Sequence, residues 1–197
     1  MLNINLFDNS GSVASGGGND PVGRRYLEAL LAIQHVGAHC RCGRELTATI
    51  HFDTPTSGDL APTPMTKPNL PAIIRSLAIP PDGAGSSCLG PSFRAAQQLI
   101  AQHPDHRPVL VALTDFELFD GDVDRLLDEF IDVPGDVHAV VLRSTPPAKL
   151  AAAPHVITTR IDYTSQPGAV ARAVFAALTA TRPHARPLAA VANKQAS

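Results

Sequence analysis

Hydrophobic residues recur along the chain in two alternating patterns. The five consecutive apolar residues at 109–113 form a run typical of a strand buried on both faces of a parallel sheet. Farther on, Val123, Leu126, Leu127, Phe130 and Ile131 follow the i, i+3, i+4, i+7, i+8 spacing of an amphipathic helix. Alternation of such runs and stripes predicts an α/β protein.

The same alternation extends over most of the chain. Further strands are expected at 2–7, 47–52, 137–142 and 156–161, because these segments are short, apolar and partly β-branched. Helices are expected after Asp20-Pro21 (fading near Gly37), after Asn69, after Gly90 and around 170–178. In the first of these helices, the side chains expected to face the core are Tyr26, Leu27, Leu30, Leu31 and Ile33.

These elements predict a mostly parallel sheet with helices on both faces. Residues 1–182 are expected to form one domain, since 197 residues correspond to about one domain. Residues 183–197 offer little that could pack and are expected to form a loose tail. Segment 54–68 is rich in Pro, Thr and Gly, which leaves a long loop or a ragged edge hairpin open.

Composition and charge narrow the classes of function. The formal net charge of −2 argues against a nucleic-acid partner, because binding to phosphates needs clustered Lys and Arg. No apolar run is long enough for a membrane span, and the first residues do not resemble a signal peptide. Three cysteines do not suit a disulfide scaffold. We therefore expect a cytoplasmic protein, and the high Ala, Pro and Arg usage is compatible with a bacterial one.

Polar oxygen-bearing residues gather where the predicted strands end. Asp8, Ser10 and Ser12 follow the first strand at i, i+2 and i+4, and Asp115 follows the strand at 109–113. The carboxyl ends of parallel strands are where such sheets bind ligands. Carboxylates and hydroxyls without His or Cys suit Mg²⁺, Mn²⁺ or Ca²⁺. Asp and Ser after a strand are also ordinary turn and cap residues, so each alone is a weak signal.

Taken together, these segments resemble the von Willebrand factor A (VWA) family and its metal-ion-dependent adhesion site. Asp8-Asn9-Ser10-Gly11-Ser12 matches the family's D-x-S-x-S, and Leu113-Thr114-Asp115 matches its later Asp after a buried strand. The segment Gly85-Ser86-Ser87-Cys88-Leu89-Gly90 is similar to the family's Gly-Thr-x-Leu-Gly. The resemblance covers roughly residues 2–180 and implies a three-layer, Rossmann-like fold.

The resemblance also implies a ligand set and a function. Ser10, Ser12 and Ser87 would bind the cation through hydroxyls, and Asp8 and Asp115 would hold it directly or through waters. A protein partner, such as an ATPase or a multi-protein assembly, would complete the shell with an Asp or Glu. Two departures stand out: Ser87 replaces the family's Thr, with Ser86 as a competitor, and Phe116 stands where the family often has Gly.

Two other functions remain open from the residues. Asp8 at the end of a first strand could be the nucleophile of a haloacid-dehalogenase-like, Mg²⁺-dependent phosphohydrolase. Ser10 then occupies the place of the second Asp, which removes the proton donor that this chemistry needs. The chain could instead be a structural α/β subunit without a metal.

Three further clusters carry weaker signals. His35, His39, Cys40 and Cys42 could bind zinc, although no second ligand pair follows at finger-like spacing. Asp122 is expected to cap the helix that follows it, while Glu117 and Asp120 are either rim ligands or solvated carboxylates. The large apolar residues beside Asp115 form either core or an apolar collar around the ion, namely Phe116, Leu118 and Phe119.

Overall fold

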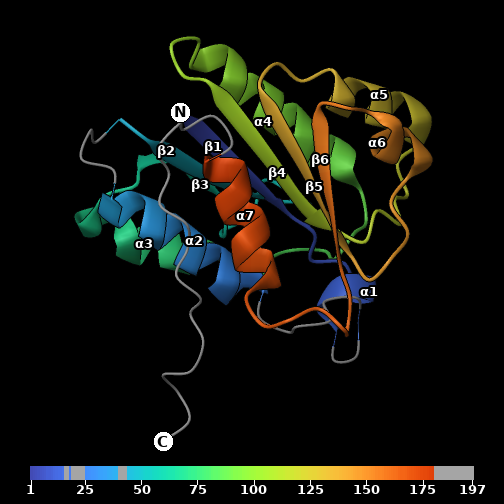
Figure 1. Ribbon diagram of the computed structural model, residues 1–197, viewed down its shortest axis with the longest axis horizontal. Coiled ribbons are helices and arrows are strands. Elements are labelled where there is room, and N and C mark those ends of the chain that lie inside the picture. The colour runs from blue at the N-terminus through green and yellow to red at the C-terminus, as the bar shows by residue number, and fades with distance from the viewer. Residues whose placement is uncertain (16–17, 19–24, 40–43, 180–197) are drawn as a thin grey trace, which may run out of the picture.

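A six-stranded sheet with the strand order β3-β2-β1-β4-β5-β6 forms the centre of the molecule (Figure 1). The computed structural model describes residues 1–15, 18, 25–39 and 44–179. All neighbouring strands are parallel except β3, which runs antiparallel to β2 at the edge. The strands are β1 (Leu2–Phe7), β2 (Leu46–His51), β3 (Leu60–Pro64), β4 (Pro108–Thr114), β5 (Asp136–Leu142) and β6 (Val156–Ile161).

Helices cover both faces of this sheet, as predicted. Figure 1 shows α2 (Arg25–His39), α3 (Leu70–Ser76) and α7 (Ala169–Thr179) grouped on one face. The other face carries α4 (Leu89–Gln102), α5 (Val123–Ile131) and the short α6 (Ala148–Ala152). A single-turn helix, α1 (Gly11–Ala14), follows β1, and a 3₁₀ turn (Lys67–Asn69) precedes α3. The prediction of an α/β fold with a mostly parallel sheet is confirmed.

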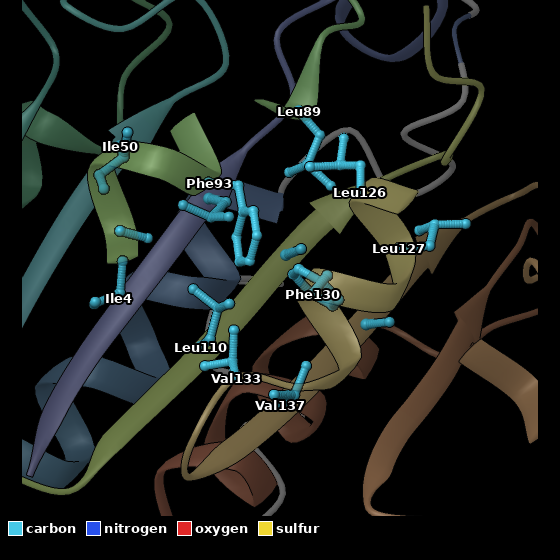
Figure 2. Close-up of a cluster of buried hydrophobic side chains, with 14 of the residues drawn as sticks. Ile4, Ile50, Leu89, Phe93, Leu110, Leu126, Leu127, Phe130, Val133 and Val137 are labelled. Atoms are coloured by element: carbon cyan, nitrogen blue, oxygen red, sulfur yellow. The ribbon is translucent and has the colours of Figure 1, made fainter. Parts of the chain in front are cut away.

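Alternate residues of the central strands feed two separate cores. Leu2, Ile4 and Leu6 of β1 belong to the core beneath α4 and α5, which contains Phe93 and Phe130 at a ring separation of 5.7 Å (Figure 2). The intervening positions point to the face covered by α2, α3 and α7. They carry both polar and apolar side chains, namely Asn3, Asn5 and Phe7. All six residues of β1 are buried, so this strand is held on both sides.

The first long helix turns a different face inward than expected. Leu27 is 50% exposed, and Leu30 and Leu31 are only partly buried, whereas Ile33 is fully buried as expected. Besides Ile33, the buried stripe of α2 consists of residues that were not predicted to face the core, namely Glu28, Ala29, Ala32 and Val36. Small side chains let two packed elements approach closely. The prediction missed this stripe because it followed the large apolar residues of the helix. The side chain of Tyr26 lies outside the described part.

Other differences concern short elements. The loop expected from Asp8 to Gly18 contains α1, and α6 was not predicted; each buries one residue, Val13 and Leu150, so no periodicity marks them. Segment 54–68 contains β3, which pairs antiparallel with β2, so this segment forms an edge hairpin and not a long loop. Asn69 precedes α3 but does not cap it, since its side chain donates to Pro64 O. The expected helix start at Asp20-Pro21 and the tail at 183–197 lie outside the described residues.

No helix within the described part of the chain combines the length and the apolar character that crossing a membrane requires.

His138, in the middle of β5, makes stability depend on pH. It is 2% exposed, and among the described residues its Nε2 has no hydrogen-bond partner. Burial lowers its pKa from 6.5 to about 4, partly opposed by the nearby Asp136. The unfolded chain therefore binds a proton at a higher pH than the folded protein does.

We expect the free energy of unfolding to fall by about 3 kcal/mol as the pH drops from 6.5 to 4, since one pKa unit equals about 1.4 kcal/mol. Urea titrations across this range should show the fall in the wild type and a flatter profile in His138→Val. The exposed His155 provides the control, because His155→Gln should keep the wild-type profile. Parallel profiles for wild type and His138→Val would contradict the assignment.

Candidate metal centre

The candidate site lies at the carboxyl edge of the sheet, between β1 and β4. The strand order places the first strand next to the fourth, which makes this pair the topological switch point where α/β sheets bind ligands. Asp8 N donates to Leu113 O at 3.1 Å, so the segments of β1 and β4 stay paired one residue beyond the end of β1. This pairing brings the segment after β1 next to Thr114 and Asp115.

Asp8 is fully buried and anchors the first loop. Its Oδ1 accepts a hydrogen bond from Ser10 N at 2.8 Å, and its Oδ2 accepts one from the Thr114 hydroxyl at 2.6 Å. The Thr114 hydroxyl also accepts a hydrogen bond from Phe116 N at 3.0 Å. A single chain of hydrogen bonds therefore links the loops that follow β1 and β4.

The two serines of the first loop present their hydroxyls side by side. Ser10 is the N-cap residue of α1, but its side chain makes no capping hydrogen bond. Instead, Ser10 Oγ and Ser12 Oγ lie 3.0 Å apart and share a hydrogen bond. In an octahedral Mg²⁺ shell with oxygens at 2.0–2.1 Å, adjacent ligands are about 2.9 Å apart. The two hydroxyls thus have the separation that neighbouring ligands need.

Asp115 is also fully buried and lies close to Asp8. Its Oδ1 accepts a hydrogen bond from Glu117 N at 3.0 Å. Burial raises the pKa of the Asp8 carboxyl, hydrogen bonds from Ser10 and Thr114 oppose this rise, and the charge of Asp115 adds to it. Two carboxylates taken out of water near each other disfavour the charged form, which a bound divalent cation would offset.

The third loop distinguishes between two adjacent serines. The Ser86 hydroxyl donates to Asp53 Oδ1, and the backbone N–H groups of Gly85 and Ser86 donate to the same carboxylate. The Ser86 hydroxyl is therefore directed at Asp53, which lies outside the predicted ligand set. Ser87 is buried, and its backbone oxygen accepts a hydrogen bond from Phe119 N at 3.1 Å, which ties this loop to the segment after Asp115. Ser87 is the better candidate ligand of the two.

The donors of this edge fit a hard divalent cation. They are oxygen atoms of Asp8, Ser10, Ser12, Ser87 and Asp115, which match the preference of Mg²⁺, Mn²⁺ and Ca²⁺. Within the described residues, no three His, Cys, Asp or Glu side chains cluster as metal ligands. A cation held here would therefore depend on the serine hydroxyls.

Two residues that the sequence analysis did not select brace the first loop. The Asn9 amide donates to His51 Nδ1 at 2.6 Å, and His51 Nε2 donates to Ser76 O at 2.9 Å at the end of α3. His51 is fully buried, so its ring connects the candidate loop to β2 and α3. Nothing in the local sequence signals this role, because the partners lie 42 and 25 residues away.

The acidic segment after Asp115 is mostly structural. Asp120 is not a solvated carboxylate, because it accepts hydrogen bonds from Leu89 N and Gly90 N, both at 2.8 Å, and so caps α4. Asp122 accepts a hydrogen bond from Arg125 N at 3.0 Å, which confirms its predicted role as the cap of α5. Glu117 is exposed, as expected for a solvated carboxylate.

The large apolar residues of this segment divide between core and surface. Phe116 has φ 58° and turns into the core, where its ring lies 6.4 Å from that of Phe130. This left-handed conformation is one that Gly adopts without strain, so a glycine would suit the same backbone. Leu118 packs partly against the core, whereas Phe119 is 80% exposed. Phe116 therefore belongs to the core, whereas the Phe119 side chain lies in solvent.

Of the four residues that could bind zinc according to the sequence, the structure describes the side chain of His35. His35 packs edge-on against Phe175 at a ring separation of 5.4 Å, which is a core contact. Cys40 and Cys42 lie outside the described residues, as does the side chain of His39.

A hollow elsewhere on the surface is remote from this edge. It encloses about 380 Å³ between the C-terminal ends of α4 and α5 and is lined mainly by Ile100, Ala101, Val133 and Pro134. Pro134 lies two residues before the start of β5, so the hollow lies at the opposite edge of the sheet from Asp8. It contributes nothing to the candidate metal centre.

Comparison with known proteins shows the fold class. No protein-family model matches the sequence, and no curated protein matches it. Among solved structures, von Willebrand factor type A from Catenulispora acidiphila is similar, with a TM-score of 0.56 and 13% identity over 88% of this chain and 41% of that one. The chain thus spans about two fifths of that protein's length.

A second solved structure matches over nearly its whole length. The SpRpn10 VWA domain has a TM-score of 0.56 and 10% identity, over 92% of this chain and 95% of that domain. The chain therefore has the VWA fold that the sequence motifs implied.

Proposed function

We propose that this chain is a protein-interaction module that binds a divalent cation at the carboxyl edge of β1 and β4. The cation would in turn bind the carboxylate of an Asp or Glu on a partner protein. The observation that carries this proposal is the pairing of Ser10 Oγ and Ser12 Oγ at 3.0 Å beside two buried carboxylates, Asp8 and Asp115. The VWA fold supports it.

Each residue has a distinct part in this proposal. Ser10, Ser12 and Ser87 bind the cation through neutral oxygens, and Asp8 and Asp115 supply the negative charge. When bound, the cation supplies an electrophilic centre that retains affinity for one more anionic oxygen. Thr114 holds the Asp8 carboxylate in place, and His51 holds Asn9 and thereby the loop. Ser10 stands where a phosphohydrolase would need a second Asp, which favours binding over catalysis.

The first test is a thermal melt of chelator-treated protein with and without Mg²⁺ or Mn²⁺. Free metal at about 100 times Kd should add about 2.7 kcal/mol to the free energy of unfolding, which raises the melting temperature by several degrees. No shift at millimolar concentrations of either metal would leave the alternative of a structural subunit.

Ser86 and Ser87 offer a matched pair for this test. Ser87→Ala should raise the Kd for Mg²⁺ about tenfold, since losing one ligand at a cost of about 1.4 kcal/mol has this effect. Ser86→Ala should lower the melting temperature without changing that Kd, because its hydroxyl is bonded to Asp53. Titration of the melting temperature with Mg²⁺ measures both constants. Equal effects of the two substitutions on Kd would contradict the assignment of Ser87.

A further inference from the structure

Phe119 is the most exposed large apolar side chain among the described residues. It is 80% exposed, compared with 60% for Tyr163 and 51% for Ile79. Its neighbours in the same loop are not exposed in this way, because Phe116 is buried and Leu118 packs partly against the core. The loop therefore places two of its three large apolar residues against the core and leaves the third in solvent. Single apolar residues are common on protein surfaces, so exposure alone does not indicate a binding role for Phe119. Its position relative to the candidate metal centre is the relevant observation.

That position is the rim of the candidate metal centre. Phe119 N donates to the backbone oxygen of Ser87 at 3.1 Å, and Phe119 follows Asp115 by four residues. Its backbone thus contacts one candidate ligand and lies on the same loop as another. The exposed ring is attached within a side chain's length of the Ser87 loop.

The backbone on both sides of Phe119 is fixed. On one side, Phe116 turns through φ 58° and packs against Phe130. On the other side, Asp120 accepts hydrogen bonds from Leu89 N and Gly90 N at the start of α4. A ring displayed on such a fixed loop loses little conformational freedom on binding, and this favours its use as an anchor in an interface.

The charge of the rim limits what can approach beside Phe119. Glu117 is exposed on the same loop, two residues before Phe119. A partner whose acidic residue binds the cation would face repulsion from this carboxylate if its neighbouring residue were also acidic. An apolar neighbour avoids this repulsion and can cover the Phe119 ring.

We propose that Phe119 is an aromatic anchor that selects partners carrying a large apolar residue next to the metal-binding acid. This inference rests on the proposed function, because the acid is held by the cation. An extended peptide advances about 3.3 Å per residue, so an apolar residue one or two positions from the acid reaches a ring beside Ser87. The recognised feature is therefore an Asp or Glu with Leu, Ile, Met, Phe, Tyr or Trp within two residues.

The probe is a displayed library of short peptides with one fixed central Asp and randomised flanking positions. It is selected in Mg²⁺ on the wild type, on Phe119→Ser and on Ile157→Ser, which removes an exposed apolar residue from β6, on the other half of the sheet. The wild type and Ile157→Ser should enrich large apolar residues within two positions of the Asp, and Phe119→Ser should not. Thermal melts with Mg²⁺ verify that all three proteins are folded and respond to the metal.

One enriched peptide and its apolar-to-Ser counterpart then give a double-mutant cycle. On the wild type, the peptide substitution should weaken binding about tenfold, and Phe119→Ser should weaken binding of the parent peptide by a similar factor. On Phe119→Ser, the peptide substitution should have less than a twofold effect. Mg²⁺-dependent selection without an apolar preference, or with the same preference on Phe119→Ser, would overturn the anchor and leave the metal-dependent function standing. Peptide binding that persists in chelator would overturn both proposals.

Discussion

Replacing Asp8 by Asn should abolish the Mg²⁺ response of the melting temperature without destabilising the metal-free protein. Asp8 is a buried carboxylate whose pKa is raised by burial and by the charge of Asp115. A carboxyl with a raised pKa in the folded state loses stability as the pH rises through that pKa. The neutral amide removes this cost, while its oxygen can still accept the hydrogen bond from Ser10 N. It can also donate to the Thr114 hydroxyl.

The measurement compares melts in chelator and at millimolar Mg²⁺. The wild type should gain about 2.7 kcal/mol at 100 times Kd, and Asp8→Asn should gain nothing. Asp105→Asn is the matched control, since it makes the same change of charge at an exposed turn far from the site and should keep the full response. An undiminished response in Asp8→Asn would remove Asp8 from the ligand set. A response lost equally in Asp105→Asn would mean that net charge alone governs metal binding.

The fold could be predicted from the sequence because its main elements carry strong periodic signals. The run at 109–113 and the stripe of α5 correspond to β4 and α5 within one residue or so at each end. The failures occurred where tertiary packing outweighs local pattern. In α2, Ala29 and Ala32 face the core while Leu27 is exposed, because close approach of neighbouring elements favours small residues there. Short elements such as α1 and α6 bury too little to leave a pattern.

The candidate site could be predicted only as far as its residues are local motifs. Asp8, Ser10 and Ser12 lie within one turn, and topology brings Asp115 beside them. The residues that brace these groups were not predictable, because Thr114 looks like an ordinary strand residue and His51 acts on Asn9 from another strand. The choice between Ser86 and Ser87 likewise needed the contact with Asp53.

The largest loss of stability is expected for Glu28→Ala, which removes a contact between two helices. Glu28 of α2 is 6% exposed, and its carboxylate lies at the N-terminus of α7. Oε1 accepts a hydrogen bond from Gly168 N at 2.8 Å, and Oε2 accepts hydrogen bonds from Val170 N at 2.9 Å and Ala171 N at 3.3 Å. The first turn of a helix has unpaired N–H groups and a positive dipole end, and a carboxylate satisfies both.

Alanine would leave the buried N–H groups of Val170 and Ala171 and the partly buried N–H group of Gly168 without an acceptor, and it would remove their charge-assisted hydrogen bonds. We expect a loss of about 3–4 kcal/mol in the free energy of unfolding, measured by urea titration. Glu28→Gln retains one amide oxygen as acceptor and should lose about half as much. Glu129→Ala is the surface control, since its exposed pair with Arg125 is worth about 0.5 kcal/mol or less.

Amide hydrogen exchange separates a local effect from a global one. If the Glu28 carboxylate holds the start of α7, the amides of Val170 and Ala171 should exchange faster in Glu28→Ala relative to those of Leu89 and Gly90. The latter pair is capped by Asp120 on another helix and serves as the internal reference. A loss of stability no larger than that of Glu129→Ala would show that Glu28 does not hold α2 and α7 together. Uniformly faster exchange in both helices would instead mean that α7 opens only when the whole domain unfolds.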